Sequence, residues 1–119
     1  NVSSLEETGH TVNDVVAQTP IVINATAVGM HPNESASVIE DMAAVTDNHF
    51  FYDLVYNPGK TRFLQLAEWA GATVQNGLRM LIFQGLQSLR IWSGKDLKLS
   101  STGLIELETI MKKELGIDG

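Results

Sequence analysis

The chain has 119 residues, of which 44% are hydrophobic and 18% charged, a composition typical of one globular domain and not of a disordered or fibrous protein. The absence of cysteine excludes a disulfide framework and a thiolate metal site. The formal net charge of −6 argues against general nucleic-acid binding, because an acidic surface repels phosphate groups. No apolar run approaches the length of a membrane span, and no signal-peptide pattern follows Asn1.

The first part of the chain predicts a helix and then a buried strand. Valines recur at helical spacing over residues 12–16, and Thr19-Pro20 should end this helix because the residue before proline avoids helical geometry. The β-branched run 21–23 predicts a strand buried on both faces, as in a parallel sheet. A loop rich in Gly, Pro and Asn follows, and apolar residues within 38–45 then suggest a loose helical turn.

The middle of the chain repeats the alternation of strand and helix. Residues 50–56 predict a second buried strand, which ends at the turn 57–59. Thr61 is suited to cap a helix that Gly71 would end, and residues 72–74 predict a third short strand.

Two further helices are predicted near the carboxyl end. The first, over residues 77–92, has apolar side chains around most of its circumference and is therefore expected to be buried. The second lies near 102–115, with Lys112 and Lys113 in its last turns, where cations suit the helix dipole. The whole order predicts an α/β fold: half of a Rossmann-like three-layer domain, with a short parallel sheet of about three strands and flanking helices.

Two polar clusters follow the first two predicted strands. Residues 24–26 come after the first strand, and Asp53 with residues 56–57 comes at the end of the second. Ligands bind at the carboxyl ends of strands in open parallel sheets, but Asn, Thr and Asp also cap backbone groups in turns. The pattern leaves both interpretations open and by itself favours turn chemistry.

Other polar residues give weaker signals. Gln84 lies within the apolar helix, where its amide would bind either a ligand or a loop carbonyl, since an unpaired buried amide costs roughly 1–3 kcal/mol. His10, His31 and His49 have no convergent spacing, so no metal site is predicted. The chain also lacks a glycine-rich phosphate-binding motif.

Three motifs carry a family resemblance that covers about residues 21–94. VINATAVGMHPN, YDLVYNPGKTRFLQLAEWAGA and NGLRMLIFQGLQSLRIWSG occur in this order and resemble the shikimate/quinate dehydrogenase family. The resemblance implies an oxidoreductase that reduces 3-dehydroshikimate to shikimate with NADP as cofactor, or that acts on quinate with NAD. It implies that about residues 1–94 form the second half of a Rossmann-type cofactor domain and that about 102–115 form its closing helix.

The resemblance also implies roles for eight residues of this chain. Tyr56 and Gln84 would contact the substrate. The nicotinamide would be seated by Asn24, Ala25, Thr26, Leu54, Gly77 and Met80. One departure is Asn76, which stands where the family usually has Asp; either residue can cap the helix that follows.

No catalytic residue is assigned in this chain. The Lys and Asp that the family uses for catalysis lie upstream of the matching region, and Lys60 is interpreted as a solvated turn lysine. We therefore expect a carboxyl-terminal fragment of a cytoplasmic enzyme of aromatic biosynthesis, which is inactive by itself. Two alternatives stay open: a non-catalytic binding module derived from the family, and a half that complements a separate chain.

The partial domain is expected to leave apolar surface uncovered. If strands are missing from the sheet, an edge and a face are exposed, and such surfaces promote association. The expected partners are therefore the substrate and the missing amino-terminal half, or a second copy of the chain, with no nucleic acid and no membrane.

Overall fold

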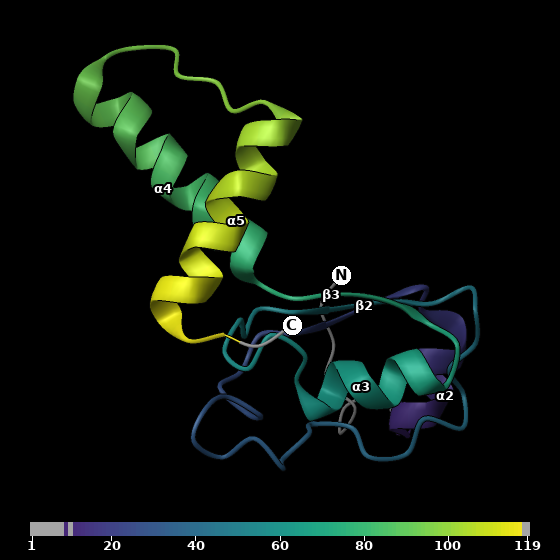
Figure 1. Cartoon of the computed structure of the whole chain (residues 1–119). Helices are drawn as coiled ribbons and strands as arrows, with labels where there is room; N and C mark the ends of the chain where they lie inside the picture. Colours follow the sequence, from purple (N-terminus) through teal and green to yellow (C-terminus); the bar gives the residue numbers. More distant parts are fainter. Residues whose placement is uncertain (1–8, 10, 118–119) are drawn as a thin grey trace.

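The computed structural model of the chain describes residue 9 and residues 11–117 (Figure 1). Helices and strands alternate in its first part and two helices follow. In chain order the elements are α2 (Val12–Gln18), β1 (Ile21–Asn24), β2 (Phe50–Asp53), α3 (Arg62–Trp69), β3 (Thr73–Gln75), α4 (Leu78–Ser93) and α5 (Ser101–Leu115). The strands pair in parallel in the order β1-β2-β3, which confirms the predicted α/β fold with a short parallel sheet.

Local capping residues set the bounds of the helices. Thr61 caps α3, as predicted, by accepting a hydrogen bond from Leu64 N at 3.3 Å. The chain leaves α3 through Gly71, whose φ of +107° is a conformation that other residues rarely adopt. Ser100 caps α5, and Lys112 and Lys113 lie in its last turn, as predicted.

The hydrophobic core lies on one face of the sheet. Phe51, on the central strand, is fully buried, and its ring centroid lies 5.2 Å from that of Phe63 on α3. Val16 of α2 joins the same cluster. Helices α2 and α3 therefore cover the same face, and both lie beneath the sheet in Figure 1.

The opposite face of the sheet is largely open. Side chains alternate along a strand, so Ile21 and Ile23 point away from the core, and they are 57% and 58% exposed. Phe50 and Tyr52 stack beside them on β2, with ring centroids 6.5 Å apart. Helices α4 and α5 rise on this side of the sheet but pack chiefly against each other (Figure 1).

Several sequence predictions were wrong. The strand over 21–23 was predicted to be buried on both faces, but Ile21 and Ile23 leave one face exposed, because nothing in the described residues covers it. Residues 38–45 form turns and not a helical turn, because Ser37 and Asp41 accept hydrogen bonds from the backbone two residues on, which competes with helix formation. Helix α4 is not buried: Leu78 and Ile82 in its first turns are its only buried residues, and Trp92 near its end is 79% exposed. Among the described helices, none is both long enough and apolar enough to cross a bilayer.

Candidate functional site

The ends of β1 and β2 meet at a buried pair of polar side chains. Asn24 and Asp53 are register partners, and both are almost completely inaccessible to solvent. The Asn24 amide nitrogen donates to Asp53 Oδ1 at 3.1 Å and to the Val28 carbonyl at 3.2 Å. The pair thereby ties the loop after β1 to the end of β2.

Asp53 accepts two more hydrogen bonds from the segments that follow it. Its Oδ1 receives the Val55 backbone N–H at 3.0 Å, and its Oδ2 receives the Thr61 hydroxyl at 2.6 Å. Burial raises the pKa of the Asp53 carboxyl, although the bonds from Thr61, Val55 and Asn24 oppose that shift. Since Thr61 also caps α3, the carboxyl group joins two strand ends to the start of a helix.

The segment after Asn24 is held by its own side chains. Asn24 Oδ1 accepts from the Thr26 backbone N–H at 3.0 Å and from the Thr26 hydroxyl at 2.6 Å. Thr26 Oγ1 in turn accepts from Val28 N at 3.1 Å. These bonds are the turn chemistry that the sequence pattern favoured, and they place Thr26 beside a pocket.

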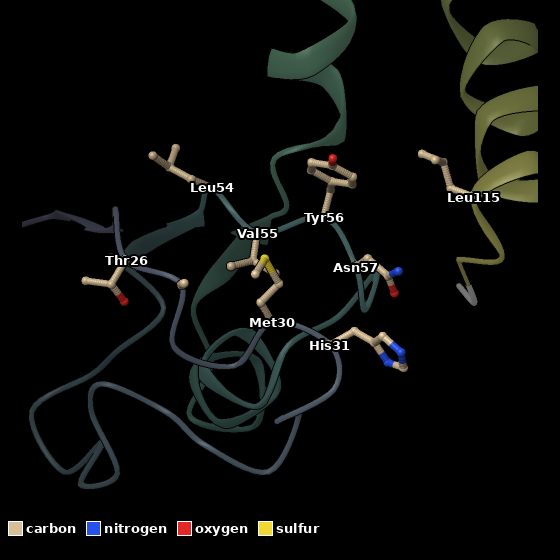
Figure 2. Close-up of a pocket in the computed structure, with 9 residues that line it drawn as sticks. Thr26, Met30, His31, Leu54, Val55, Tyr56, Asn57 and Leu115 are labelled. Atoms are coloured by element: carbon tan, nitrogen blue, oxygen red, sulfur yellow. The ribbon is translucent and has the colours of Figure 1, made fainter.

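A pocket of about 420 Å³ lies at these strand ends (Figure 2). Its walls are more apolar than polar, and Tyr56 and Leu115 face each other across it. The residues that line it are Thr26, Ala27, Met30, His31, Leu54, Val55, Tyr56, Asn57 and Leu115. An apolar pocket with a few hydroxyl and amide groups suits a flat ring that bears polar substituents.

Gly77 fixes the position of Leu54. A Cβ built on Gly77 would overlap the carbonyl oxygen of Leu54, and Gly77 N donates to the Val55 carbonyl at 3.2 Å. Asn76 supports this contact, because its Oδ1 accepts from Leu78 N at 3.0 Å while its amide donates to the Gly59 carbonyl at 2.7 Å. Asn76 thus performs the capping role expected of that position.

The structure brings some of the predicted site residues together. Three of them line the pocket: Thr26, Leu54 and Tyr56. Asn24 lies directly behind the pocket wall, and Gly77 packs against Leu54.

Three other predicted site residues are not among those that line the pocket: Ala25, Met80 and Gln84. Gln84 is exposed on α4, so the prediction that its amide is buried was wrong. The sequence pattern could not show this, because the side of α4 that carries Gln84 is left uncovered in the part of the chain that the structure describes.

Sequence reasoning missed several residues of the site. Met30 and His31 follow the polar loop, and no periodicity places them. Leu115 comes from the far end of α5, and only the tertiary fold brings it to the pocket. Thr61 was predicted only as a cap; its 2.6 Å bond to Asp53 depends on the packing of α3 beside the sheet.

The remaining titratable residues that the structure describes suggest no metal site or second catalytic site. Within the described residues, no group of three or more His, Asp or Glu side chains could hold a metal ion. His49 is buried, whereas His31 lies on the surface within 3.6 Å of Glu34. His10 lies outside the described residues. Lys60 is exposed, as predicted, and pairs with Glu68 at 2.7 Å.

Comparisons with known proteins connect this geometry with one group of enzymes. No protein-family model matches the chain. The shikimate dehydrogenase (NADP(+)) of Carboxydothermus hydrogenoformans is 35% identical over 97 residues, which are 82% of this chain and 31% of that enzyme. That of Streptococcus equi subsp. zooepidemicus is 40% identical over 86 residues, 71% of this chain and 29% of that enzyme.

A search of solved structures finds dehydrogenases that act on shikimate or quinate. The shikimate 5-dehydrogenase of Listeria monocytogenes, in complex with shikimate and NAD, matches with a TM-score of 0.72 and 31% identity over 83% of this chain and 32% of its own. The quinate dehydrogenase of Corynebacterium glutamicum, in complex with NAD, matches with a TM-score of 0.69 and 26% identity, over 86% of this chain and 34% of its own.

The chain thus spans about a third of the curated relatives that it matches, with 31% and 29% of their lengths covered. Sequence and fold agree, because the identity extends over most of this chain and solved shikimate dehydrogenases share its backbone arrangement. Over most of its length, the chain is similar in sequence to shikimate dehydrogenases and shares their Rossmann-like fold.

Proposed function

We propose that this chain forms the nicotinamide side of the active site in a shikimate dehydrogenase-like oxidoreductase. The reaction would be the reduction of 3-dehydroshikimate to shikimate, with NADPH as the hydride source. The observation that carries the proposal is the pocket itself. Thr26, Leu54 and Tyr56, to which the family resemblance gives cofactor and substrate roles, come from two different strand ends and line one pocket.

The pocket residues fit the two ligands of such a reaction. Met30, Leu54 and Val55 offer an apolar surface for a nicotinamide ring, and they would exclude water from its reacting face. The hydroxyl groups of Thr26 and Tyr56 could orient the carboxamide and a hydroxylated substrate. The bound cofactor carries the hydride, so the task of these residues is positioning.

The remaining assigned residues complete the proposal. Asn24 holds Thr26 in place, and Gly77 holds Leu54. Ala25 would add to the cofactor side of the site. Met80 and Gln84 are on α4 beyond the pocket, where they would meet the nicotinamide and the substrate once the rest of the protein completes the site.

Catalysis needs groups beyond this chain. Hydride transfer to a carbonyl needs an acid within hydrogen-bond reach of the reacting oxygen, and the resemblance places the catalytic Lys and Asp outside the matching region. We therefore propose that the chain alone is inactive and that a further portion, corresponding to the other two thirds of its relatives, completes the enzyme. That portion would also cover the exposed faces of the sheet and of α4.

A second candidate is oxidation of quinate with NAD. It is favoured by the similarity to the Corynebacterium glutamicum quinate dehydrogenase, whose TM-score of 0.69 is close to the 0.72 of the shikimate enzyme from Listeria. Both substrates are cyclic hydroxy acids, so Tyr56 and Gln84 could serve either one. The two candidates differ in which substrate and cofactor support turnover.

A chimeric enzyme tests the proposal. Residues 12–117 would replace the matching third of the Carboxydothermus hydrogenoformans shikimate dehydrogenase, and NADPH formation from shikimate would be followed by absorbance. We expect activity from the chimera and none from the isolated chain. Turnover of quinate with NAD in the same assay would identify the second candidate. A folded chimera that binds neither cofactor contradicts both candidates.

Two substitutions sharpen the test in the chimera. Tyr56→Phe removes one hydroxyl from the pocket and should raise the KM for shikimate with little effect on the KM for NADP. Lys60→Ala is the matched control, because Lys60 is exposed and bonds only to Glu68 among the described contacts. Equal kinetics in the two variants would remove Tyr56 from the substrate site.

A further inference from the structure

We propose that Asp53 is a positioning residue for the pocket: its buried carboxylate fixes Leu54 and Thr26 in the geometry that the ligands require. The proposal rests on the proposed function, because it concerns the same pocket. Asp53 itself is not among the residues that line the pocket, and no role is assigned to it by the family resemblance.

The first argument is the convergence of three donors on one side chain. Asn24 and Val55 donate to Oδ1 at 3.1 and 3.0 Å, and Thr61 donates to Oδ2 at 2.6 Å. These donors belong to the end of β1, the segment after β2 and the start of α3. Only an acceptor with two oxygen atoms can satisfy all three at once, and a carboxylate meets that requirement.

The second argument is the place of the pocket residues in this network. Leu54 lies between Asp53 and Val55, so its backbone is held on both sides by the carboxylate and its bond to Val55 N. Thr26 is held by Asn24 Oδ1, while the amide of the same side chain is oriented by Asp53. A shift of Asp53 would therefore reach both walls of the pocket.

The third argument is burial. Asp53 and Thr61 are 0% exposed and Asn24 is 2% exposed, and within the described residues no buried side-chain nitrogen or oxygen lacks a hydrogen-bond partner. Water therefore cannot replace a lost bond without a structural change. The alternative is that Asp53 only stabilises the start of α3 through Thr61; stability would then change, and kinetics would not.

The experiment uses the chimeric enzyme and a matched pair of substitutions at Thr61. Thr61→Val removes the hydroxyl that Asp53 accepts, whereas Thr61→Ser keeps it. Asp53→Asn retains one acceptor oxygen but converts the other into a donor, and Asp53→Ala removes both. Thr11→Val is the control, since Thr11 caps α2 through Asp14 N in the same way but does not line the pocket.

We expect Thr61→Val to lower kcat/KM about tenfold and Asp53→Ala about 100-fold, because small misplacements in an active site have effects of that order. Thr61→Ser should keep near-normal kinetics, and Asp53→Asn should lie between the chimera and Asp53→Ala. Thr11→Val should lower the melting temperature through the lost cap while its kinetics stay unchanged.

Each outcome has a separate meaning. If Asp53→Ala does not fold, Asp53→Asn and the Thr61 pair decide the question. An active chimera in which Thr61→Val and Asp53→Asn change only the melting temperature overturns the positioning role and leaves the proposed function standing. A folded but inactive chimera, before any substitution, overturns the proposed function instead.

Discussion

Gly77 lies against the Leu54 carbonyl, and no side chain fits between them. Gly77→Ala should therefore push apart the end of β2 and the start of α4, and overpacking of this kind costs about 1–3 kcal/mol. Gly85→Ala is the matched control, because a Cβ there meets nothing within 4 Å and alanine favours a helix by roughly 0.5–1 kcal/mol. Urea unfolding of the chain should show a loss for the first variant and a gain for the second. A Gly77→Ala variant as stable as the unsubstituted chain would show that the backbone at Leu54 moves aside at little cost in free energy.

The Asp53 carboxyl gives a pH-dependent prediction at the same scale. Burial raises its pKa in the folded chain above the value of about 3.9 for unfolded Asp, so the folded state holds the proton to higher pH. The stability that this group contributes is therefore present below about pH 3.9 and is lost as the pH rises through the folded-state pKa. Asp53→Asn lacks this titration.

The measurement for Asp53 is urea unfolding at a series of pH values. The free energy of unfolding of Asp53→Asn, minus that of the unsubstituted chain, should increase as the pH rises from about 4 towards neutrality. Asp41→Asn is the control, because hydrogen bonds from Asn13 and Ala43 lower the pKa of exposed Asp41, so that its difference should stay flat above about pH 4 and change only below it. A flat or falling difference for Asp53→Asn would show that its three hydrogen bonds outweigh burial.

Residues with a local role were predictable and residues with a tertiary role were not. Thr61 was identified as a cap because a cap depends on three neighbouring residues. The polar residues after β1 and β2 were identified because strand ends in parallel sheets collect such groups. The pattern could not predict that Leu115 lines the pocket, which depends on contacts between distant segments, or that Gln84 is exposed, which depends on the absence of such a contact.

Helices and strands were likewise predictable where neighbouring residues determine them and not where tertiary contacts do. Every strand was predicted, because runs such as 21–23 carry β-branched residues between clear turn signals. Helix α4 was predicted in its bounds but not in its burial, because an apolar surface does not reveal whether its cover lies in the same segment. Residues 38–45 do not form the predicted helical turn, because apolar spacing there is outweighed by side chains that bond to the backbone.

The side chain of His49 ties helix α2 to the start of β2. His49 donates from Nε2 to the Val16 carbonyl at 2.7 Å, while its Nδ1 accepts from Thr46 N at 3.0 Å; this pair of bonds defines the neutral tautomer. His49→Leu keeps the volume and removes both bonds, leaving Thr46 N without its acceptor. We expect a loss of about 1–3 kcal/mol and faster amide exchange in α2 than in α3.

The control for this prediction is a second histidine. His31→Leu changes a side chain that is 63% exposed, and substitutions at such positions usually stay within about 0.5 kcal/mol. Hydrogen exchange followed by mass spectrometry would resolve α2 from α3. Equal exchange in α2 for His49→Leu and the unsubstituted chain would show that Val16 packing alone holds the helix.

The whole molecule is less compact than a closed domain of its size. Its radius of gyration is 16.5 Å, whereas a compact domain of this length has about 13.5 Å. The difference reflects α4 and α5, which extend from the sheet (Figure 1). Two apolar surfaces result: the open sheet face with Ile21 and Ile23, and the carboxyl end of α4 with Ile91 and Trp92.

These two surfaces predict how the isolated chain behaves in solution. Apolar patches of this kind promote association, so we expect the chain to sediment with a mass above 13.0 kDa as its concentration rises. The association should persist at high salt, because it depends on apolar burial and not on charge. Ile23→Glu and Ile91→Glu, combined, should lower the mass towards that of the monomer, since each places a charge where burial would be costly. Lys60→Glu adds acidity on an exposed turn, distinguishes a general charge effect from a surface-specific one, and should leave association unchanged. A chain that stays at 13.0 kDa at every concentration would show that neither surface drives self-association, and would leave the further portion proposed above as the cover for both surfaces.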